Sequence, residues 1–200
     1  MIRVGFIGTP GSGKTSTARA LASQCRRIDA LNNVEIVSEY ARRYISKHGS
    51  IDFLWEQYRI LHKQLEWETS VENDNLDLLI TDSPIFVGFA YCLDLREKLE
   101  CNKKEDMVLK DLFSDMIRLN SPIRYDIIFH IPPVLQPIDD GVRPKSNFDD
   151  NWRSRMDNRL KVVFDIFRPK ELITIEQEDL QSRVNVCIEH ISKSIEKEKN

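Results

Sequence analysis

Cysteine and histidine are scarce in this chain, and neither residue type is grouped. The four cysteines, Cys25, Cys92, Cys101 and Cys187, are widely spaced and form no Cys-x-x-Cys pair. We therefore expect reduced, mostly buried thiols rather than a disulfide framework or a thiolate metal site. The four histidines show no His-Glu-x-x-His grouping, which argues against a zinc site.

Long apolar runs and a large net charge are also absent. No apolar run approaches ~18 residues, so the sequence predicts no membrane-spanning helix. The N-terminus enters an apolar run directly, without the pattern of a signal peptide, and we expect a cytoplasmic protein. The net charge of −3 gives no sign of a nucleic-acid partner, although it is compatible with a local basic patch. A homo-oligomer is left open.

Five short apolar runs predict buried strands, and helix-length segments separate them. The predicted strands are Ile2–Ile7, Val34–Val37, Leu78–Thr81, Ile127–Ile131 and Leu172–Ile175. The predicted helices are Lys14–Gln24, Ile51–Glu72, Ile85–Glu100, Lys104–Leu119, Asp150–Phe167 and Leu180–Glu196. This alternation predicts an α/β fold, with a five-stranded parallel sheet and helices on both faces. The length suits one domain over residues 1–200.

Residues 8–15 read Gly-Thr-Pro-Gly-Ser-Gly-Lys-Thr, which is a complete phosphate-binding loop. It lies between a predicted strand and a predicted helix, as such a loop requires. Lys14 can reach the β- and γ-phosphates, and the Thr15 hydroxyl can coordinate Mg²⁺. We therefore predict ATP and Mg²⁺ as cofactors, although no residue pattern distinguishes ATP from GTP. The predicted nucleotide-binding residues are Gly8, Gly11, Ser12, Gly13, Lys14, Thr15 and Ser16.

Two carboxylates follow predicted strands at the edge of the sheet that also carries the phosphate loop. Asp82 ends the third strand, and we expect it to hold Mg²⁺ together with Thr15. Glu39 follows the second strand, and it could orient or deprotonate a substrate hydroxyl. Asp82 competes for that base role, and the sequence leaves the choice open. Both also have structural interpretations, since Asp often ends strands and Glu is favoured at a helix start.

Arg42 and Gln57 are candidate substrate-binding residues. Arg42 could steady an anion through charge-assisted hydrogen bonds. Gln57 and Gln64 share one face of a predicted helix, where an amide could read a base or nicotinamide edge. A surface position is the more common role for glutamine, whereas for Arg42 a substrate contact and a solvated helix start are about equally compatible with the sequence. Trp55 belongs to an apolar stripe of the same helix that we expect to be mainly core, although its ring could stack on a base.

A turn-rich insertion follows the fourth strand, and we predict a small lid over residues 132–155. The segment contains Pro132, Pro133, Pro137, Gly141 and Pro144. It should lie at the carboxyl ends of the strands, beside the bound nucleotide. Its arginines Arg143, Arg153 and Arg155 could neutralise a transferring phosphoryl group, or pair with nearby aspartates at the surface. Chain position favours the functional role for Arg143.

Four motifs together carry a family resemblance. GTPGSGKT, VSEYARRY, TDSP and DDGVRP resemble the P-loop kinase-like domains related to the ribosylnicotinamide kinase half of the bacterial NAD regulator. Such domains are often labelled AAA-type ATPase domains and are frequent in phage genomes. The resemblance covers roughly residues 1–180, and it implies a three-layer P-loop NTPase sandwich. It implies phosphate and Mg²⁺ contacts for Lys14 and Thr15, a metal or base role for Asp82, and a lid role for Arg143.

Three functions are compatible with these observations. The leading one is ATP- and Mg²⁺-dependent phosphoryl transfer to a nucleoside-like hydroxyl, such as that of nicotinamide riboside. Its catalytic residues would be Lys14, Asp82, Glu39 and Arg143, and its substrate-binding residues Glu39, Arg42 and Gln57. A second is a kinase that acts on hydroxymethylated bases in phage DNA, which needs a basic groove. A third is a nucleotide-dependent switch or binding module, which needs no acceptor site.

Overall fold

The computed structural model describes residues 1–29, 31–72, 75–98, 103–118, 124–133, 136–137 and 141–199. Five parallel strands form one sheet in the order β2-β3-β1-β4-β5. The strands are β1 (Ile2–Ile7), β2 (Val34–Val37), β3 (Leu78–Asp82), β4 (Ile127–His130) and β5 (Leu172–Thr174). All five predicted strands are therefore present, with ends that differ by at most one residue.

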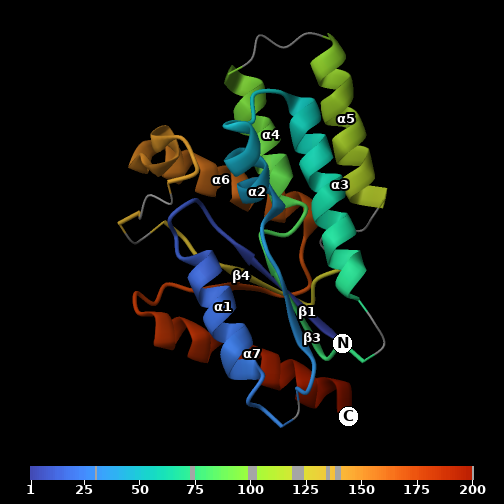
Figure 1. Cartoon of the computed structure of the whole chain (residues 1–200), viewed down its shortest axis with the longest axis vertical. Helices are drawn as coiled ribbons and strands as arrows, with labels where there is room; N and C mark the ends of the chain where they lie inside the picture. Colours follow the sequence, from blue (N-terminus) through green and yellow to red (C-terminus); the bar gives the residue numbers. More distant parts are fainter. Residues whose placement is uncertain are drawn as a thin grey trace.

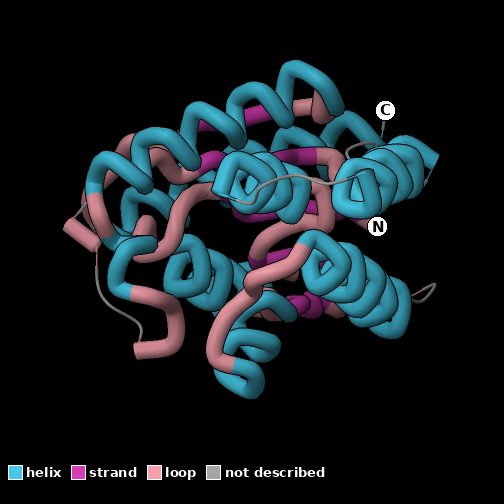
Figure 2. The backbone as a smooth tube through the Cα atoms, turned by 90° about the horizontal axis from the view of Figure 1, so that it is seen from above, coloured by secondary structure: helices cyan, strands magenta, loops and turns pink. Residues whose placement is uncertain are grey.

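Helices cover both faces of this sheet, as the alternation of apolar runs predicted (Figure 1). They are α1 (Lys14–Cys25), α2 (Tyr40–His48), α3 (Leu54–Val71), α4 (Val87–Lys98), α5 (Lys103–Arg118), α6 (Asp150–Phe167) and α7 (Leu180–Lys199). A short 3-10 helix, η1 (Lys145–Phe148), precedes α6. The view along the sheet in Figure 2 shows the strands between the two helical layers.

Alternating side chains of the strands divide the core into two layers. On one face, Val4 and Phe6 of β1 pack with Phe129 of β4 against α1 and α7. On the other face, Ile7 and Ile128 pack against α3, α4, α5 and α6. Because successive strand residues point to opposite faces, a fully buried strand such as β3 contributes side chains to both layers.

Helix α2 is the one α-helix of the described residues that the apolar pattern did not predict. Its sequence, YARRYISKH, has only two buried residues, Tyr44 and Ile45, so no long apolar stripe marks it. Helix α3 also begins at Leu54 rather than at the predicted Ile51. The Glu56 carboxylate explains this start, because it accepts hydrogen bonds from the backbone N–H groups of Asp52 and Phe53 at 2.7 and 2.9 Å.

Several other predictions fall partly outside the described residues. The predicted helix ends at Glu100 and Leu119, the thiol Cys101, and parts of the lid segment lie there. The division into a domain with a lid over 132–155 therefore stays a prediction. Cys25, Cys92 and Cys187 are buried and unpaired, as expected for reduced thiols. Along the described ranges, no helix combines the length and apolar character that a membrane crossing requires.

The buried Glu68 carboxylate on α3 leads to a prediction about the pH dependence of stability. Glu68 accepts a 2.6 Å hydrogen bond from the Tyr125 hydroxyl, and burial raises the pKa of its carboxyl to about 7. Unfolding lowers that pKa, so the folded state loses stability as the pH rises from about 4.5 towards 7. Glu68→Gln should therefore gain on the order of 2 kcal/mol of unfolding free energy relative to wild type between pH 5 and pH 8.

Urea denaturation at pH 5 and pH 8 measures this gain. Glu178→Gln is the matched control, since Glu178 is exposed on the loop before α7. An equal stability difference at the two pH values in Glu68→Gln would contradict the raised pKa.

Candidate functional site

The phosphate loop connects β1 to α1 and depends on glycine at two crowded positions. Gly8 has a φ of 148°, and a Cβ there would lie 2.3 Å from the Ile131 carbonyl oxygen. Gly13 has a φ of 92°, and a Cβ there would lie 2.6 Å from the Arg183 guanidinium. Both positions therefore exclude larger residues by conformation and by space. This packing holds the loop against β4 and α7.

Polar groups inside the loop are buried without protein partners. The hydroxyls of Thr9 and Ser12 are buried, and neither has a hydrogen-bond partner among the described residues. Lys14 donates a 3.0 Å hydrogen bond from Nζ to the Thr9 carbonyl oxygen. Burial lowers the pKa of the Lys14 ammonium, while Glu39 and Asp82 oppose that shift. Buried hydroxyls without partners and a buried ammonium form a cradle that suits anionic phosphate oxygens.

Thr15 and Asp82 lie together at the start of α1 and the end of β3. The Thr15 hydroxyl donates a 2.5 Å hydrogen bond to Asp82 Oδ2, while Asp82 Oδ1 is buried without a partner among the described residues. Burial, with a further contribution from Glu39, raises the pKa of the Asp82 carboxyl. One carboxylate and one hydroxyl fit Mg²⁺, which takes its remaining ligands from water and substrate phosphates. The described residues hold no cluster of three metal-ligating side chains.

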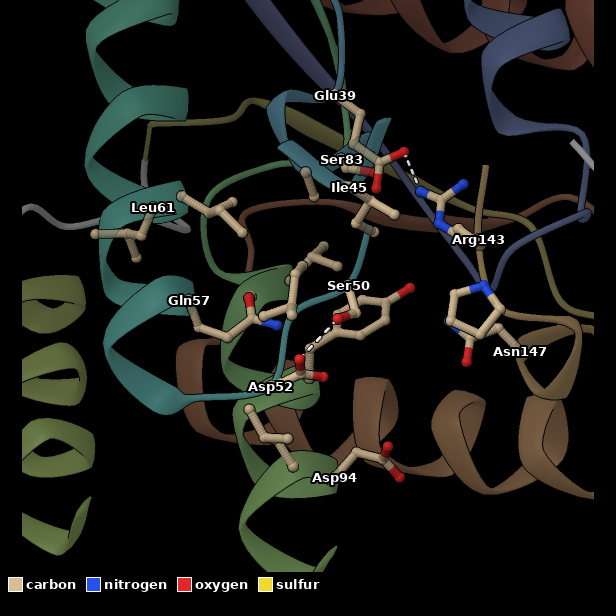
Figure 3. Close-up of a pocket in the computed structure, with 18 of the residues that line it drawn as sticks. Glu39, Ile45, Ser50, Asp52, Gln57, Leu61, Ser83, Asp94, Arg143 and Asn147 are labelled. Carbon is tan, nitrogen blue, oxygen red and sulfur yellow. Dashed lines mark hydrogen bonds and ion pairs between the residues drawn. The ribbon is translucent and has the colours of Figure 1, made fainter. Parts of the chain in front are cut away.

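Glu39 and Arg143 form a buried ion pair on the other side of Lys14. The Arg143 guanidinium donates from Nη2 to Glu39 Oε2, and both side chains are less than a tenth exposed (Figure 3). Burial alone would raise the pKa of Glu39, but Arg143 and Lys14 outweigh it and lower that pKa. Glu39 is thus held as a carboxylate at neutral pH, whereas Asp82 is biased towards its protonated form. The two acids have opposite electrostatic environments.

A cavity of about 250 Å³ opens beside this ion pair, between α2, α3, α4 and the segment before α6. Its walls are largely apolar, with Ile45 from α2, Leu61 from α3 and Val87 from α4. Polar side chains also line it, among them Gln57, Asp94 and Asn147, which are labelled in Figure 3. A cavity that combines apolar walls with convergent polar groups is the usual form of a small-molecule site.

The other candidate residues are distributed unevenly around the site. The Gln57 side chain is buried in the cavity wall, and the Gln64 amide oxygen accepts a 2.8 Å hydrogen bond from the Tyr40 backbone N–H. The charge of Arg42 contributes to the lowered pKa of Glu39 and opposes the rise in the pKa of Asp82, so Arg42 lies close enough to influence both carboxylates. Ser16 is exposed on the first turn of α1.

Arg153 fits the alternative of pairing with an aspartate, whereas Trp55 differs from expectation. Arg153 is buried on α6 and pairs with Asp150 at 3.2 Å, and Arg155 is exposed on the same helix. Trp55 is 47% exposed, so its expected place in the core was wrong. It lies on the first turn of α3 next to Leu54, which is buried in the core, so this turn directs Leu54 inward and leaves the Trp55 indole at the surface.

Sequence reasoning missed several residues that the fold brings to the site. Tyr91 and Asp94 of α4 line the cavity, and they lie on the same helix face as Leu95 and Lys98. Their helical spacing was the feature of the sequence from which this shared face could have been predicted. Ser83 also lines the cavity and has a φ of 68°, a left-handed conformation that the sequence does not reveal.

Arg183 of α7 is a further missed residue, because nothing in the sequence connects it with residues 8–15. Its Nη1 donates a 2.9 Å hydrogen bond to the Ser12 carbonyl oxygen, and its Nε donates to the Gln177 carbonyl oxygen at 2.6 Å. The guanidinium thereby ties the loop before α7 to the phosphate loop, and it fixes the direction of one loop carbonyl.

Comparison with known proteins identifies the family. A family model described as an AAA domain matches residues 3–183. The chain belongs to this AAA domain family. No curated protein sequence matches the chain.

Solved kinase structures share the architecture of this AAA domain. The NadR protein in complex with NR has a TM-score of 0.71 at 20% identity, over 96% of this chain and 49% of that chain. This chain thus spans about half the length of NadR. The thymidylate kinase from Ehrlichia chaffeensis has a TM-score of 0.63 at 19% identity, over 95% and 98% of the two chains.

The deoxyadenosine kinase from M. mycoides with bound dATP has a TM-score of 0.60 at 12% identity, over 96% and 100% of the two chains. Identities this low show the fold alone, and that fold is the predicted P-loop NTPase sandwich.

Proposed function

We propose that this protein transfers the γ-phosphoryl group of ATP to a hydroxyl group of a nucleoside-like small molecule. The observation that carries the proposal is a convergence at one edge of the sheet. Glu39 and Arg143 line one cavity, and the Glu39 carboxylate interacts electrostatically with Lys14 of the phosphate loop and with Asp82, which pairs with Thr15. Proteins of many functions have a nucleotide-binding loop. In this protein, the cavity lined by Glu39 and Arg143 also provides space for a phosphate acceptor.

Each residue has a distinct role in the proposed reaction. Lys14 and the loop N–H groups hold the β- and γ-phosphates in line with the acceptor hydroxyl. Thr15 and Asp82 would hold Mg²⁺, which supplies neutralisation of the phosphate charge. The acceptor oxygen forms a bond to the γ-phosphorus, and the bond to the β–γ bridging oxygen breaks to release ADP. Glu39 accepts the hydroxyl proton, and its lowered pKa keeps it ionised for that step.

Arg143 acts beside Glu39 at the phosphoryl group. Its guanidinium can shift part of its hydrogen bonding from Glu39 to the equatorial oxygens of the transferring group. That shift also frees a Glu39 oxygen to face the acceptor hydroxyl. The segment that carries Arg143 leads through η1 into α6, and Asn147 of η1 lines the cavity.

The charges of the cavity favour a nucleoside over a nucleotide as the acceptor. Glu39, Asp52 and Asp94 contribute carboxylates, while Arg143 and Lys98 contribute cations. Both cations pair with carboxylates of the same cavity, Arg143 with Glu39 and Lys98 with Asp94 at 2.6 Å. A monophosphate would need such cations for itself. An uncharged or cationic acceptor, such as nicotinamide riboside, fits this lining better.

A mass-spectrometric acceptor screen tests the proposal. Purified protein, ATP and Mg²⁺ are incubated with separate pools of nucleosides, nicotinamide riboside and nucleoside monophosphates. We expect one nucleoside to gain the mass of one phosphate, and we expect no product from the Lys14→Ala variant. Phosphorylation of monophosphates alone would overturn the acceptor class. ATP hydrolysis without any phosphorylated acceptor would favour the nucleotide-dependent switch.

A further inference from the structure

The outer surface of α2 and α3 carries a basic and aromatic hollow that the proposed reaction does not use. The hollow has a volume of about 280 Å³, and it is lined by Tyr40, Arg43, Tyr44, Lys47, His48, Arg59, Lys63 and Trp67. We refer to these residues, together with Phe53 and Trp55, as the α2–α3 outer face. The same two helices line the acceptor cavity with their opposite sides, for example with Ile45 and Leu61.

Positive charge is concentrated on this face although the whole chain has a net charge of −3. Four lysines and arginines line the hollow, and the lining contains no aspartate or glutamate. Lys63 pairs with Glu66 at 2.5 Å outside the lining. Lys47 and Arg59 are exposed, and neither forms an ion pair with any described carboxylate. Such segregation creates a local positive potential that the net charge conceals.

The cations and rings follow the helical repeat. On α3, Trp55, Arg59, Lys63 and Trp67 recur at every fourth residue, and on α2 Arg43 and Lys47 have the same spacing. Residues four apart lie on one side of a helix, about 6 Å apart along its axis. The α3 row therefore presents a ring, two cations and a second ring in succession. The α2 cations lie beside it across the hollow.

Several rings of this face are open to a stacking partner. Phe53 and Trp55 are 49% and 47% exposed, and their rings are nearly parallel, with centroids 6.3 Å apart. At the other end of the row, the Arg43 guanidinium lies 5.4 Å from the centre of the Trp67 ring. Tyr40 meets Trp67 edge to face at 4.9 Å, which fixes the orientation of that indole. Fixed rings between exposed cations are the features of a single-strand binding surface.

We propose that the α2–α3 outer face binds single-stranded nucleic acid. Phosphates lie on Arg43, Lys47 and Arg59, while bases stack on the exposed rings of Phe53 and Trp55. Duplex DNA fits less well, because the rings require unpaired bases with open faces. Binding here involves no residue of the phosphate loop, so it stands apart from the proposed phosphoryl transfer.

Fluorescence anisotropy with a labelled oligothymidylate of twelve nucleotides tests this inference. We expect the logarithm of the binding constant to fall linearly with the logarithm of the salt concentration, with a slope of about −2 for three phosphate contacts. The variant Lys47→Glu/Arg59→Glu should bind at least tenfold more weakly. Its matched control is Arg19→Glu/Lys110→Glu, which makes the same change in net charge at exposed positions on α1 and α5. The control should bind like the wild type.

A second comparison separates stacking from charge. Inorganic polyphosphate of matched length has the charge of the oligonucleotide but no bases. Trp55→Ala should weaken oligonucleotide binding about tenfold and leave polyphosphate binding unchanged. Indole fluorescence should also be quenched by the oligonucleotide alone, since Trp152 is buried and the other tryptophans lie on this face. Equal binding of both polyanions, or equal affinity of the two charge-reversal variants, would overturn the inference.

Discussion

Asp82→Asn should lower phosphoryl transfer on the order of 10³-fold and raise the melting temperature of the nucleotide-free protein. The loss follows because the metal contributes several kcal/mol of charge stabilisation and an amide is a poor Mg²⁺ ligand. The gain in stability has a separate cause, which is the burial of the Asp82 carboxylate. Asp82 is 2% exposed, and burial together with Glu39 raises the pKa of its carboxyl. The ionised form of Asp82 therefore destabilises the nucleotide-free protein.

The direction of the stability change follows from proton linkage. The pKa of Asp82 is higher in the folded than in the unfolded chain, so the fold loses stability as the pH rises above the unfolded value. Asparagine cannot ionise, and its amide oxygen can still accept the hydrogen bond of Thr15. A gain of ~1 kcal/mol corresponds to about 2–4 °C for a chain of this size.

Differential scanning fluorimetry at pH 7, with and without ATP and Mg²⁺, measures both sides of this trade-off. The wild type should gain more from the nucleotide and metal than Asp82→Asn does. Asp165→Asn is the control, because Asp165 is exposed on α6. A variant that melts lower than the wild type without nucleotide, or keeps full activity, would contradict the assignment of Asp82 to the metal.

The sheet could be predicted from the sequence because each of its strands is a short apolar run. β1, β3 and β4 lie in the centre of the sheet and are buried on both faces, so they show almost no polar residue. The phosphate loop could also be predicted from the sequence, since its geometry requires glycine and lysine at fixed positions. Helix α2 was not, because a mostly exposed helix of nine residues leaves no apolar period to detect.

The site was predictable only where strand ends determine position. Glu39 and Asp82 follow neighbouring strands, and parallel strands bring their carboxyl ends to one edge. The Glu39–Arg143 pair joins residues 104 positions apart through side chains, which no local pattern encodes. The same holds for Arg183, which reaches the Ser12 carbonyl oxygen across 171 positions. Net charge likewise concealed the basic α2–α3 outer face, since charge averaged over a chain says nothing of its distribution.

Glu39→Gln should lower phosphoryl transfer by about 10²–10⁴-fold and also destabilise the protein, in contrast to Asp82→Asn. The activity falls because glutamine cannot accept the hydroxyl proton, and general base catalysis contributes about that factor. Stability falls because the buried Arg143 guanidinium loses its charged partner. Breaking a buried ion pair from one side costs about 3–5 kcal/mol. The neutral amide retains one hydrogen bond, so a value at the low end is expected.

The pH dependence of the free energy of unfolding provides an independent test of the Glu39 ion pair. The pKa of Glu39 is lowered in the folded protein, so its stabilising contribution is present above the unfolded value of about 4.5 and is lost as the pH falls through the folded value. The stability difference between wild type and Glu39→Gln should therefore shrink below pH 4.5. Glu35→Gln, exposed on β2, is the control and should show no such change.

A double-mutant cycle separates the base role of Glu39 from its ion pair. Adding Arg143→Met to Glu39→Gln removes the buried guanidinium that has lost its Glu39 carboxylate, so the double variant should recover much of the lost stability. It should recover none of the activity, because neither the proton acceptor nor the cation at the phosphoryl group is restored. Chemical denaturation and single-turnover phosphoryl transfer with the acceptor from the screen measure the two quantities separately. Recovery of both together would mean that the activity of Glu39→Gln falls because the Arg143 guanidinium loses its carboxylate partner, and not because a general base is missing.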